Sequence, residues 1–528
     1  MRLLPDSGPP SPSRSHLMPP RTPSPNLLII LTDQQRFDSL SLHGSAAHTP
    51  HYDSLAAAGA NLERHHAQSP VCVPSRSTLF TGRYPSAHGV MENFARVSGS
   101  EIHLFKVLQE AGYWMAYHGK NHFLAPAEMK ANLDEFSETE FVDHGDPRRA
   151  EYVALERASL ARLSTHGSFA SAAFHDFPDE VTTTGVIARD VRASLSRAPA
   201  ERPWCTVASF FDPHVPHLAP RRFARSYPEE SMALPPLPEG DLFAGKPPRL
   251  RIKHQAQASD RATDADKRRY LSVYAGMVAF VDEQVGGILA ALRNRPDADR
   301  TIVVFTSDHG DFCWHHGLCK KDLVLYEDLL HVPAVIHWPA AIASCVIDHA
   351  FTGHVDLMPT LLDLAGLGIP SACQGRSFAP LLRGEAQAFR DSTYAEVCYP
   401  WMRNPFPDYA AFRAAWESTD PRQVKLRSGA NYNIPGDHTK SVRTTSWSYL
   451  WYGDGFEELY HLEQDPEEWH NLAADPACAD TLAAMRELLR VQAASATERR
   501  SPAEIAADAA CYPRWVSVPP PINPAMGQ

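Results

Sequence analysis

Short apolar runs that end in polar residues recur along this chain. They lie at 26–31, 113–117, 203–211 and 301–305. A continuous apolar run of this length is typical of a strand buried on both faces, as in a parallel sheet. Helical stretches are predicted between these runs, at 103–112 and 264–294. The alternation of strands and helices predicts an α/β fold, in which helices sandwich a mostly parallel central sheet.

The pattern changes after about residue 385, where a smaller C-terminal α+β domain is predicted. A segment at 398–440 is rich in aromatic residues, prolines and charges and has no clear period. Beyond it, 441–451 and 457–462 resemble a hairpin, and 481–493 resembles a helix. We therefore expect a large α/β domain over 26–385 and a smaller domain over 386–512.

Both ends of the chain are expected to lie outside these domains. The first 25 residues contain eight prolines and five serines. They lack the apolar core of a secretory signal and are expected to form a disordered tail over 1–25. The proline-rich end, 513–528, is expected to form an extended tail.

Composition narrows the class of protein. The net charge is −12 over 528 residues with no basic patch, which argues against a nucleic-acid partner. No continuous apolar stretch approaches the roughly 18 residues that cross a membrane, so no membrane partner is expected. The nine cysteines are an odd number in a long chain, which is unlike a disulfide scaffold. Reduced thiols and the missing signal together predict a cytoplasmic protein.

Polar side chains follow three of the predicted strands. Asp33 follows the first strand, His214 follows the strand at 203–211, and Asp308 with His309 follows the strand at 301–305. Sites in open α/β sheets are built at the carboxyl ends of strands. A single aspartate at such a place is nevertheless more often a helix cap or turn residue, so position alone does not identify a site.

A fourth element, at 69–89, adds a cysteine to these strand ends. Cys72 stands ahead of a predicted helix that starts near Pro74 or Ser75, since proline is favoured at the first helical position. Free N–H groups at a helix start suit an anion or an activated nucleophile, and Arg76 adds a planar donor fork. On these grounds the element is either an oxyanion site with a reactive cysteine or, more commonly, a buried structural cysteine.

The residues of this element identify a family. Cys72-x-Pro74-x-Arg76, followed by Thr-Gly-Arg83, closely resembles the signature of the type I sulfatases of the alkaline phosphatase superfamily. The resemblance extends from residue 26 to about 472. Its further matches, in order, lie at 31–34, 112–122, 213–216, 307–311, 321–333 and 458–472. The resemblance implies an alkaline phosphatase-like fold.

The resemblance also implies a modified residue and a cation. In this family a maturation enzyme reads Cys-x-Pro-x-Arg and converts the cysteine, here Cys72, to Cα-formylglycine. One divalent cation would then be held by Asp33, Gln34, residue 72, Asp308 and His309. Such oxygen-rich ligands favour Ca²⁺, with Mg²⁺ or Mn²⁺ as alternatives.

Two of these ligands depart from the commonest sulfatase set. Gln34 replaces a second aspartate, and His309 stands where many members have asparagine. Both residues occur in some bacterial sulfatases and in phosphonate monoester hydrolases. The imidazole makes Mn²⁺ or Zn²⁺ less implausible, which leaves the ion's identity open.

The mechanism implied by the family uses five further side chains. One hydroxyl of hydrated formylglycine attacks sulfur and displaces an alcohol, and the second hydroxyl then loses its proton as sulfate is eliminated. Arg76, Lys120 and Lys321 would stabilise charge on the sulfuryl oxygens. His214 would be the general acid, with Lys321 assisting, and His122 would help the second hydroxyl lose its proton.

Two choices within this set rest on spacing. Lys321 is preferred to Lys320 because it fits a Lys-x4-Tyr-Glu pattern. The cysteines and histidines at 309–319 match no zinc-binding spacing, so we interpret Cys313 and Cys319 as incidental thiols.

The sequence leaves three functions open. The first is hydrolysis of a small sulfate ester, and the second is hydrolysis of a phosphonate monoester or phosphodiester at the same site. The third, a non-catalytic binding protein, is disfavoured because every expected catalytic side chain is present. The sequence does not fix the substrate, and an oligomer is compatible with it.

Overall fold

A large sheet forms the centre of the molecule. The computed structural model describes residues 24–398 and 438–498 except residue 322, with parts of 501–516. Eight strands follow the order β11-β2-β10-β9-β1-β7-β4-β5. In that order their bounds are Cys345–Ile347, Ala60–Leu62, Ala334–His337, Thr301–Ser307, Asn26–Thr32, Trp204–Ser209, Trp114–Gly119 and Glu135–Ser137. Only β10 runs antiparallel to its neighbours, so the predicted mostly parallel sheet is confirmed.

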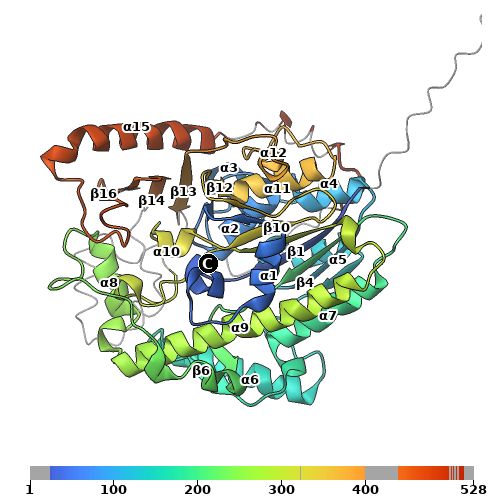
Figure 1. Cartoon of the computed structure of the whole chain (residues 1–528), viewed down its shortest axis with the longest axis horizontal. Coiled ribbons are helices and arrows are strands. Elements are labelled where there is room, and N and C mark those ends of the chain that lie inside the picture. Colours follow the sequence, from blue (N-terminus) through green and yellow to red (C-terminus); the bar gives the residue numbers. More distant parts are fainter. Residues whose placement is uncertain are drawn as a thin grey trace, which may run out of the picture.

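Helices cover both faces of this sheet (Figure 1). Side chains of β1 alternate between two cores, with Leu27, Ile29 and Leu31 in one and Leu28 and Ile30 in the other. The helices on the first face are α2 (Cys72–Thr81), α4 (Leu104–Glu110), α5 (Pro126–Asn132), α11 (His354–Leu364) and α12 (Ala379–Leu382). Those on the second are α1 (Pro50–Ala58), α7 (Thr183–Arg197) and α9 (Asp264–Arg293). Burial on both faces explains why β1 reads as one apolar run.

The long helix α9 belongs to the core. Its start is fixed by a capping box, in which Thr263 accepts from the backbone of Asp266 and the Asp266 carboxylate accepts from Thr263 in return. By length and composition alone α9 could cross a membrane, although no continuous apolar run of that length was expected in the chain. Its apolar window is 78% buried inside the protein, however, as is typical of a core helix.

The C-terminal part forms a separate antiparallel sheet. Its strands β13 (Ser392–Cys398), β14 (His438–Thr444), β15 (Trp447–Tyr452) and β16 (Glu457–His461) pair in chain order. The hairpin expected over 441–462 is therefore incorrect in detail, because a turn at 445–446 splits its first arm into β14 and β15. The helix α15 (Ala479–Ala496) packs on this sheet through Leu482, Met485 and Leu489 (Figure 1).

Several sequence expectations fall at the chain ends and loops. Residues 399–437, which make up most of the segment without a clear period, lie outside the described residues, as do 1–23 and 517–528. The described start of the predicted C-terminal tail is held to the catalytic domain rather than extended freely. Trp515 is buried, and its indole donates to Glu128 on α5 at 2.7 Å. None of the nine cysteines, all of which are described, forms a disulfide.

The order of strands brings the predicted site residues together. β1 lies between β9 and β7, and Thr32 pairs with Ser307 while Leu31 pairs with Ser209. The three parallel strands therefore end at one edge of the sheet. Asp33 follows β1, the middle strand. The residues that follow β7 and β9 lie on either side of it.

Candidate active site

The helix α2 carries Cys72 into this edge. It begins at Cys72, two or three residues before the predicted start, and Pro74 occupies its third position. Proline fits there because the first N–H groups of a helix have no partner within it. Asn93 accepts from the free N–H of Val73 at 3.1 Å, and all ten residues of α2 are buried.

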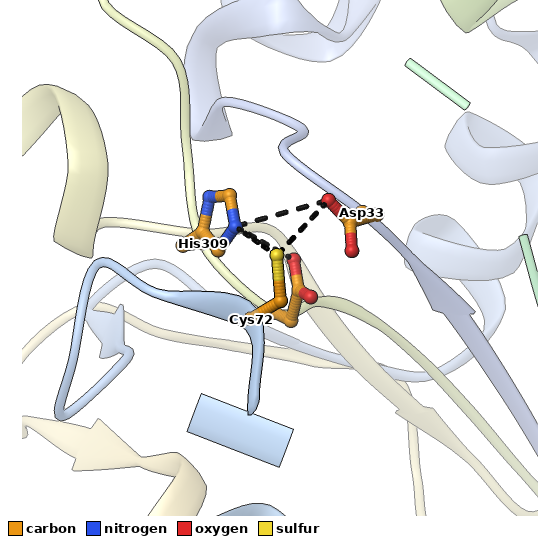
Figure 2. A group of neighbouring side chains, drawn as sticks. Asp33, Cys72 and His309 are labelled. Carbon is orange, nitrogen blue, oxygen red and sulfur yellow. Dashed lines mark hydrogen bonds and ion pairs between the residues drawn. The ribbon is translucent and has the colours of Figure 1, made fainter. Parts of the chain in front are cut away.

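Four predicted ligands meet around the thiol. Figure 2 shows Asp33, Cys72 and His309 turned toward one another. Cys72 Sγ lies 3.3 Å from His309 Nε2 and 3.8 Å from Asp33 Oδ1. With Asp308, their ligand atoms all lie within 4.8 Å of one another, and all four residues are buried. The structure therefore brings four of the five predicted ligands together.

Two lysines surround the same sulfur. Lys321 Nζ lies 2.7 Å from Cys72 Sγ, and Lys120 Nζ lies 3.9 Å from it. Burial and Asp33 oppose ionisation of the thiol, but Lys120, Lys321 and His309 outweigh them and hold the pKa of Cys72 well below its usual value. Residue 72 thus occupies a position that stabilises negative charge. Lys321, rather than Lys320, provides the ammonium group there.

Arg76 makes other contacts than the one expected from the family resemblance. Its side chain is fully buried, with Nε donating to Asp308 at 2.7 Å and Nη2 donating to Asp33 at 3.0 Å. Nη1 donates to Ser209 Oγ at 2.7 Å and to the Lys120 carbonyl at 3.1 Å. These bonds commit the guanidinium to holding the two carboxylates, so the expected contact with sulfuryl oxygens does not fit this geometry.

The carboxylates differ in how easily they ionise. Burial alone would raise the pKa of Asp33, but Lys120 at 2.7 Å and the neighbouring His214 hold that pKa well below its usual value. Burial and the nearby Asp33 raise the pKa of Asp308 to about 6. The pair therefore shares a region in which a second negative charge is costly without a cation.

His214 and His122 lie at the rim of the site. His214 Nε2 is 3.9 Å from Asp33 Oδ1, and its Nδ1 faces the Val215 carbonyl at 2.7 Å. A carbonyl only accepts, so Nδ1 carries the proton and Nε2 faces the site. Burial and the two nearby lysines lower the pKa of His214 to about 4. His122 Nε2 lies 3.7 Å from Glu140 Oε2.

The residues present fit a divalent cation. His309 Nδ1 donates to the Gly310 carbonyl at 2.9 Å, which leaves its Nε2 lone pair facing the cluster, as in metal-ligating histidines. The Oε1 atom of Gln34 is buried and has no hydrogen-bond partner among the described residues. Carboxylate and amide oxygens suit Ca²⁺ or Mg²⁺, and the imidazole nitrogen also admits Mn²⁺ or Zn²⁺.

In a second group of potential metal ligands, an arginine already neutralises the charge of the single carboxylate. His66, Glu327 and His331 lie close together, but Arg443 Nε is 2.9 Å from the Glu327 carboxylate. The cysteines and histidines at 313–319 form no such group within the described part of the chain. Cys313 and Cys319 instead pack in the core beside α9, in agreement with their interpretation as incidental thiols.

Comparison with known proteins identifies the family. Residues 25–367 match the family model described as Sulfatase. The chain belongs to the sulfatase family. It is accordingly a sulfuric ester hydrolase by class. This sulfatase is 28% identical over 473 residues to a choline-sulfatase of Rhizobium meliloti strain 1021, covering 86% of the chain and 83% of the relative. An arylsulfatase of Clostridium perfringens strain 13 is 24% identical over 492 residues, covering 88% and 93%.

Solved structures share the fold of this sulfatase. A 2-O GAG sulfatase superposes with a TM-score of 0.67 at 25% identity, covering 90% of this chain and 93% of that one. The phosphonate monoester hydrolase of Agrobacterium radiobacter superposes with a TM-score of 0.69 at 25% identity, covering 89% and 96%. The neighbours therefore include both chemistries that the sequence left open.

Sequence reasoning missed several residues of the site in this sulfatase. Ser209, the last residue of β7, accepts from Arg76, and Glu140 pairs with His122 from a loop with no recognisable motif. Asp311 lies inside the matched stretch at 307–311, yet it was assigned no role. Its carboxylate accepts from the Gln34 amide at 2.5 Å. A polar residue inside a matched stretch was the only available signal for Asp311.

Asp212, just after β7, is expected to make the stability depend on pH. Burial raises its pKa to about 7, although the Thr184 hydroxyl donates to it at 2.6 Å. Between about pH 4 and pH 7 this carboxyl is ionised in the unfolded chain and protonated in the folded one, so stability falls as the pH rises. Asp212→Asn should therefore raise the free energy of unfolding by about 4 kcal/mol at pH 8.

Urea denaturation of parent and variant at pH 4.5 and pH 8 measures this difference. At pH 4.5 the difference should shrink to about 1 kcal/mol, because the folded parent is then protonated at Asp212 and only the ionisation of the unfolded chain still contributes. The exposed Asp299 provides the control, since Asp299→Asn should change little at either pH. An Asp212→Asn protein that tracks the parent at both pH values would contradict the prediction.

Proposed function

We propose that this sulfatase hydrolyses a small sulfate monoester to sulfate and an alcohol, using formylglycine made from Cys72. The observation that carries the proposal is the position of residue 72. It opens α2 beside Asp33 and His309, with the ammonium group of Lys321 at 2.7 Å. A nucleophilic oxygen at this position has cationic groups close by to stabilise charge on the transferred group.

Hydrated formylglycine would supply a hydroxyl nucleophile at residue 72. A divalent cation would be held by Asp33, Gln34, Asp308, His309 and residue 72, and it would supply Lewis-acid chemistry when bound. Lys120 and Lys321 would bind the anionic sulfuryl group from two sides, since their ammonium groups lie 3.9 and 2.7 Å from Cys72 Sγ. Arg76 would keep Asp33 and Asp308 in place.

His214 is proposed to deliver the proton to the departing alcohol. The Nδ1–H group of His214 donates to the Val215 carbonyl, and this bond orients the ring so that Nε2 faces the site. The neighbouring Lys120 and Lys321 add to the effect of burial in lowering its pKa to about 4. A bound anionic ester offsets those charges, so His214 can take up a proton in the complex. His122, paired with Glu140, would act as a base during release of sulfate.

Hydrolysis of a phosphonate monoester is the second candidate function. The phosphonate monoester hydrolase with a TM-score of 0.69 supports it, as do Gln34 and His309 among the proposed ligands. Parallel assays on the sulfate and phenylphosphonate esters of one phenol would separate the two functions. We expect kcat/KM to be at least about tenfold higher on the sulfate ester, a difference of about 1.4 kcal/mol in transition-state stabilisation. The reverse order would make the phosphonate ester the better substrate.

The role of His214 predicts a dependence on the leaving group. His214→Ala should lower kcat/KM about 10²–10⁴-fold on an alkyl sulfate, whose oxygen needs a proton to depart. The loss on a nitrophenyl sulfate should be much smaller, because that oxygen leaves readily as an anion. Lys321→Ala is the matched comparison and should lose activity on both esters, since its charge would contact the sulfuryl group. Equal losses from His214→Ala on both esters would instead assign His214 to sulfate binding and favour Lys321 as the acid.

A further inference from the structure

The Gln34 amide is fixed in one of its two orientations. Its Nε2 donates to Asp311 Oδ2 at 2.5 Å, whereas its Oε1 is buried without a hydrogen-bond partner among the described residues. An amide nitrogen can only donate and a carboxylate without a proton can only accept, so Asp311 selects the nitrogen end. The oxygen is thus the free end of this buried side chain. Buried polar atoms in folded proteins usually have a partner, so the free oxygen suggests a missing one.

Asp311 is itself fixed by donors. The Tyr270 hydroxyl donates to its two oxygens at 2.8 and 3.0 Å. The backbone N–H groups of Cys313 and Lys320 donate to Oδ1 at 2.7 and 3.1 Å. The side chain is fully buried, and each of these contacts fits a carboxylate that only accepts. Asp311 therefore presents a fixed acceptor to Gln34.

The backbone of Gln34 is held as tightly as its side chain. Its φ is +66°, in the left-handed region that residues other than glycine seldom adopt. The N–H donates to Asp308 Oδ1 at 3.1 Å, and the carbonyl accepts from the Tyr274 hydroxyl at 2.8 Å. Strained conformations of this kind persist where the surroundings determine them, most often at functional sites. Gln34 is therefore tied directly to Asp308.

We propose that Asp311 is the positioning residue that makes Gln34 a cation ligand. By holding Nε2, Asp311 turns Oε1 toward the cation that Asp33, Asp308 and His309 would bind. The commonest sulfatases carry a second aspartate where this chain has Gln34. In this chain the residue hydrogen-bonded to Gln34, Asp311, carries the corresponding negative charge. This inference rests on the cation of the proposed function.

The test replaces Asp311 by its neutral isostere. In Asp311→Asn, Oδ1 can still accept from the backbone N–H groups of Cys313 and Lys320. The new amide nitrogen cannot accept from Gln34, however, so the Gln34 amide should rotate and turn its NH₂ group toward the cation. Calorimetric titration of cation-free protein with Ca²⁺, and separately with Mn²⁺, should show affinity about 10–100-fold below that of the parent, as is typical when a supporting partner is lost.

A reciprocal exchange should restore binding. In the double variant Gln34→Glu/Asp311→Asn, the asparagine amide donates to one glutamate oxygen and leaves the other for the cation. Its affinity should return to within about threefold of the parent, unlike either single change. Gln34→Glu alone places a glutamate carboxylate beside the Asp311 carboxylate, with no N–H group between them to donate a hydrogen bond. It should weaken binding at least about tenfold despite its added charge, which keeps the test decisive if Asp311→Asn does not fold.

Tyr270→Phe is the matched control. It removes one donor from Asp311 but keeps the bond to Gln34, so its cation affinity should fall much less than that of Asp311→Asn. Three results would overturn this inference and leave the proposed function standing. They are parent-like affinity in Asp311→Asn, a double variant that binds no better than Asp311→Asn, and tighter binding by Gln34→Glu. A parent protein that binds neither Ca²⁺ nor Mn²⁺ would overturn the proposed cation site together with it.

Discussion

Replacing Cys72 by serine is expected to lower kcat by a factor on the order of 10⁴–10⁶, comparable to losing a covalent nucleophile in other enzymes. Serine offers one hydroxyl where hydrated formylglycine has two. It can therefore take the sulfuryl group from a substrate but has no second hydroxyl with which to eliminate sulfate. We expect a single turnover of alcohol release, followed by a serine peptide about 80 Da heavier, the increment of an SO₃ group transferred to an oxygen nucleophile.

Mass spectrometry of the tryptic peptide spanning residues 65–76 provides both measurements. In active parent protein this peptide should be about 18 Da lighter than the thiol form, because the SH and one hydrogen are replaced by an aldehyde oxygen. Ser69→Ala lies in the same peptide outside the five-residue signature and serves as the control for digestion and folding. Full activity from a parent with an unmodified thiol, or sustained turnover by Cys72→Ser, would contradict the proposed nucleophile.

Asp308→Asn is expected to remove the cation and to lower turnover on the order of 10³-fold, several kcal/mol of lost charge stabilisation. The asparagine oxygen can still accept from Gln34, but its NH₂ group then faces Arg76 Nε, which now donates to Asp308 at 2.7 Å. The site would lose a ligand charge and gain two opposed donors. Both changes disfavour the arrangement in which Asp33 and His309 converge.

Elemental analysis of purified protein, after removal of loosely held ions, measures the loss. The parent should hold about one divalent ion per chain and Asp308→Asn well under half of that, given the tight binding of ions by several buried charged ligands. Asp299→Asn, on the exposed surface, should match the parent. An active parent without any divalent ion would remove the cation from the proposed function.

The residues that meet in the site could be predicted because the sheet obeys a simple rule. Parallel strands read as apolar runs, and their carboxyl ends share one edge, so polar residues after such runs can be grouped. Asp33 and Asp308 illustrate this, since Thr32 and Ser307 are partners in the sheet. The family resemblance then added Cys72 and Lys321, which follow no strand of the sheet, and it singled out Lys120, the residue after β4.

The functions of individual side chains were harder to predict. Arg76 was expected to face the substrate because guanidinium groups suit oxyanions. Its actual partners, Asp33 and Asp308, are 43 and 232 residues away along the chain. Whether an arginine points outward or holds two carboxylates depends on distances that motif spacing does not contain. The same holds for Asp311, whose contact with Gln34 joins two loops.

Local signals also misplaced element ends. The start of α2 was set at Pro74 or Ser75 because proline favours the first helical position, yet any of the first positions lacks an N–H partner and can hold it. The turn at 445–446 was missed because it carries neither glycine nor proline. Both errors shift boundaries without changing the layers of the fold.

The depth at which α2 lies has a consequence for the order of events in the life of the chain. Cys72 is 1% exposed and Arg76 is fully buried, with its guanidinium committed to both carboxylates. A second protein cannot hold five consecutive residues that lie beneath a finished sheet edge. If the proposed formylglycine is made from Cys72, the enzyme that makes it would have to reach this segment before β1, β7 and β9 assemble. Modification and folding would then compete in time, and a chain that folds first would keep its thiol.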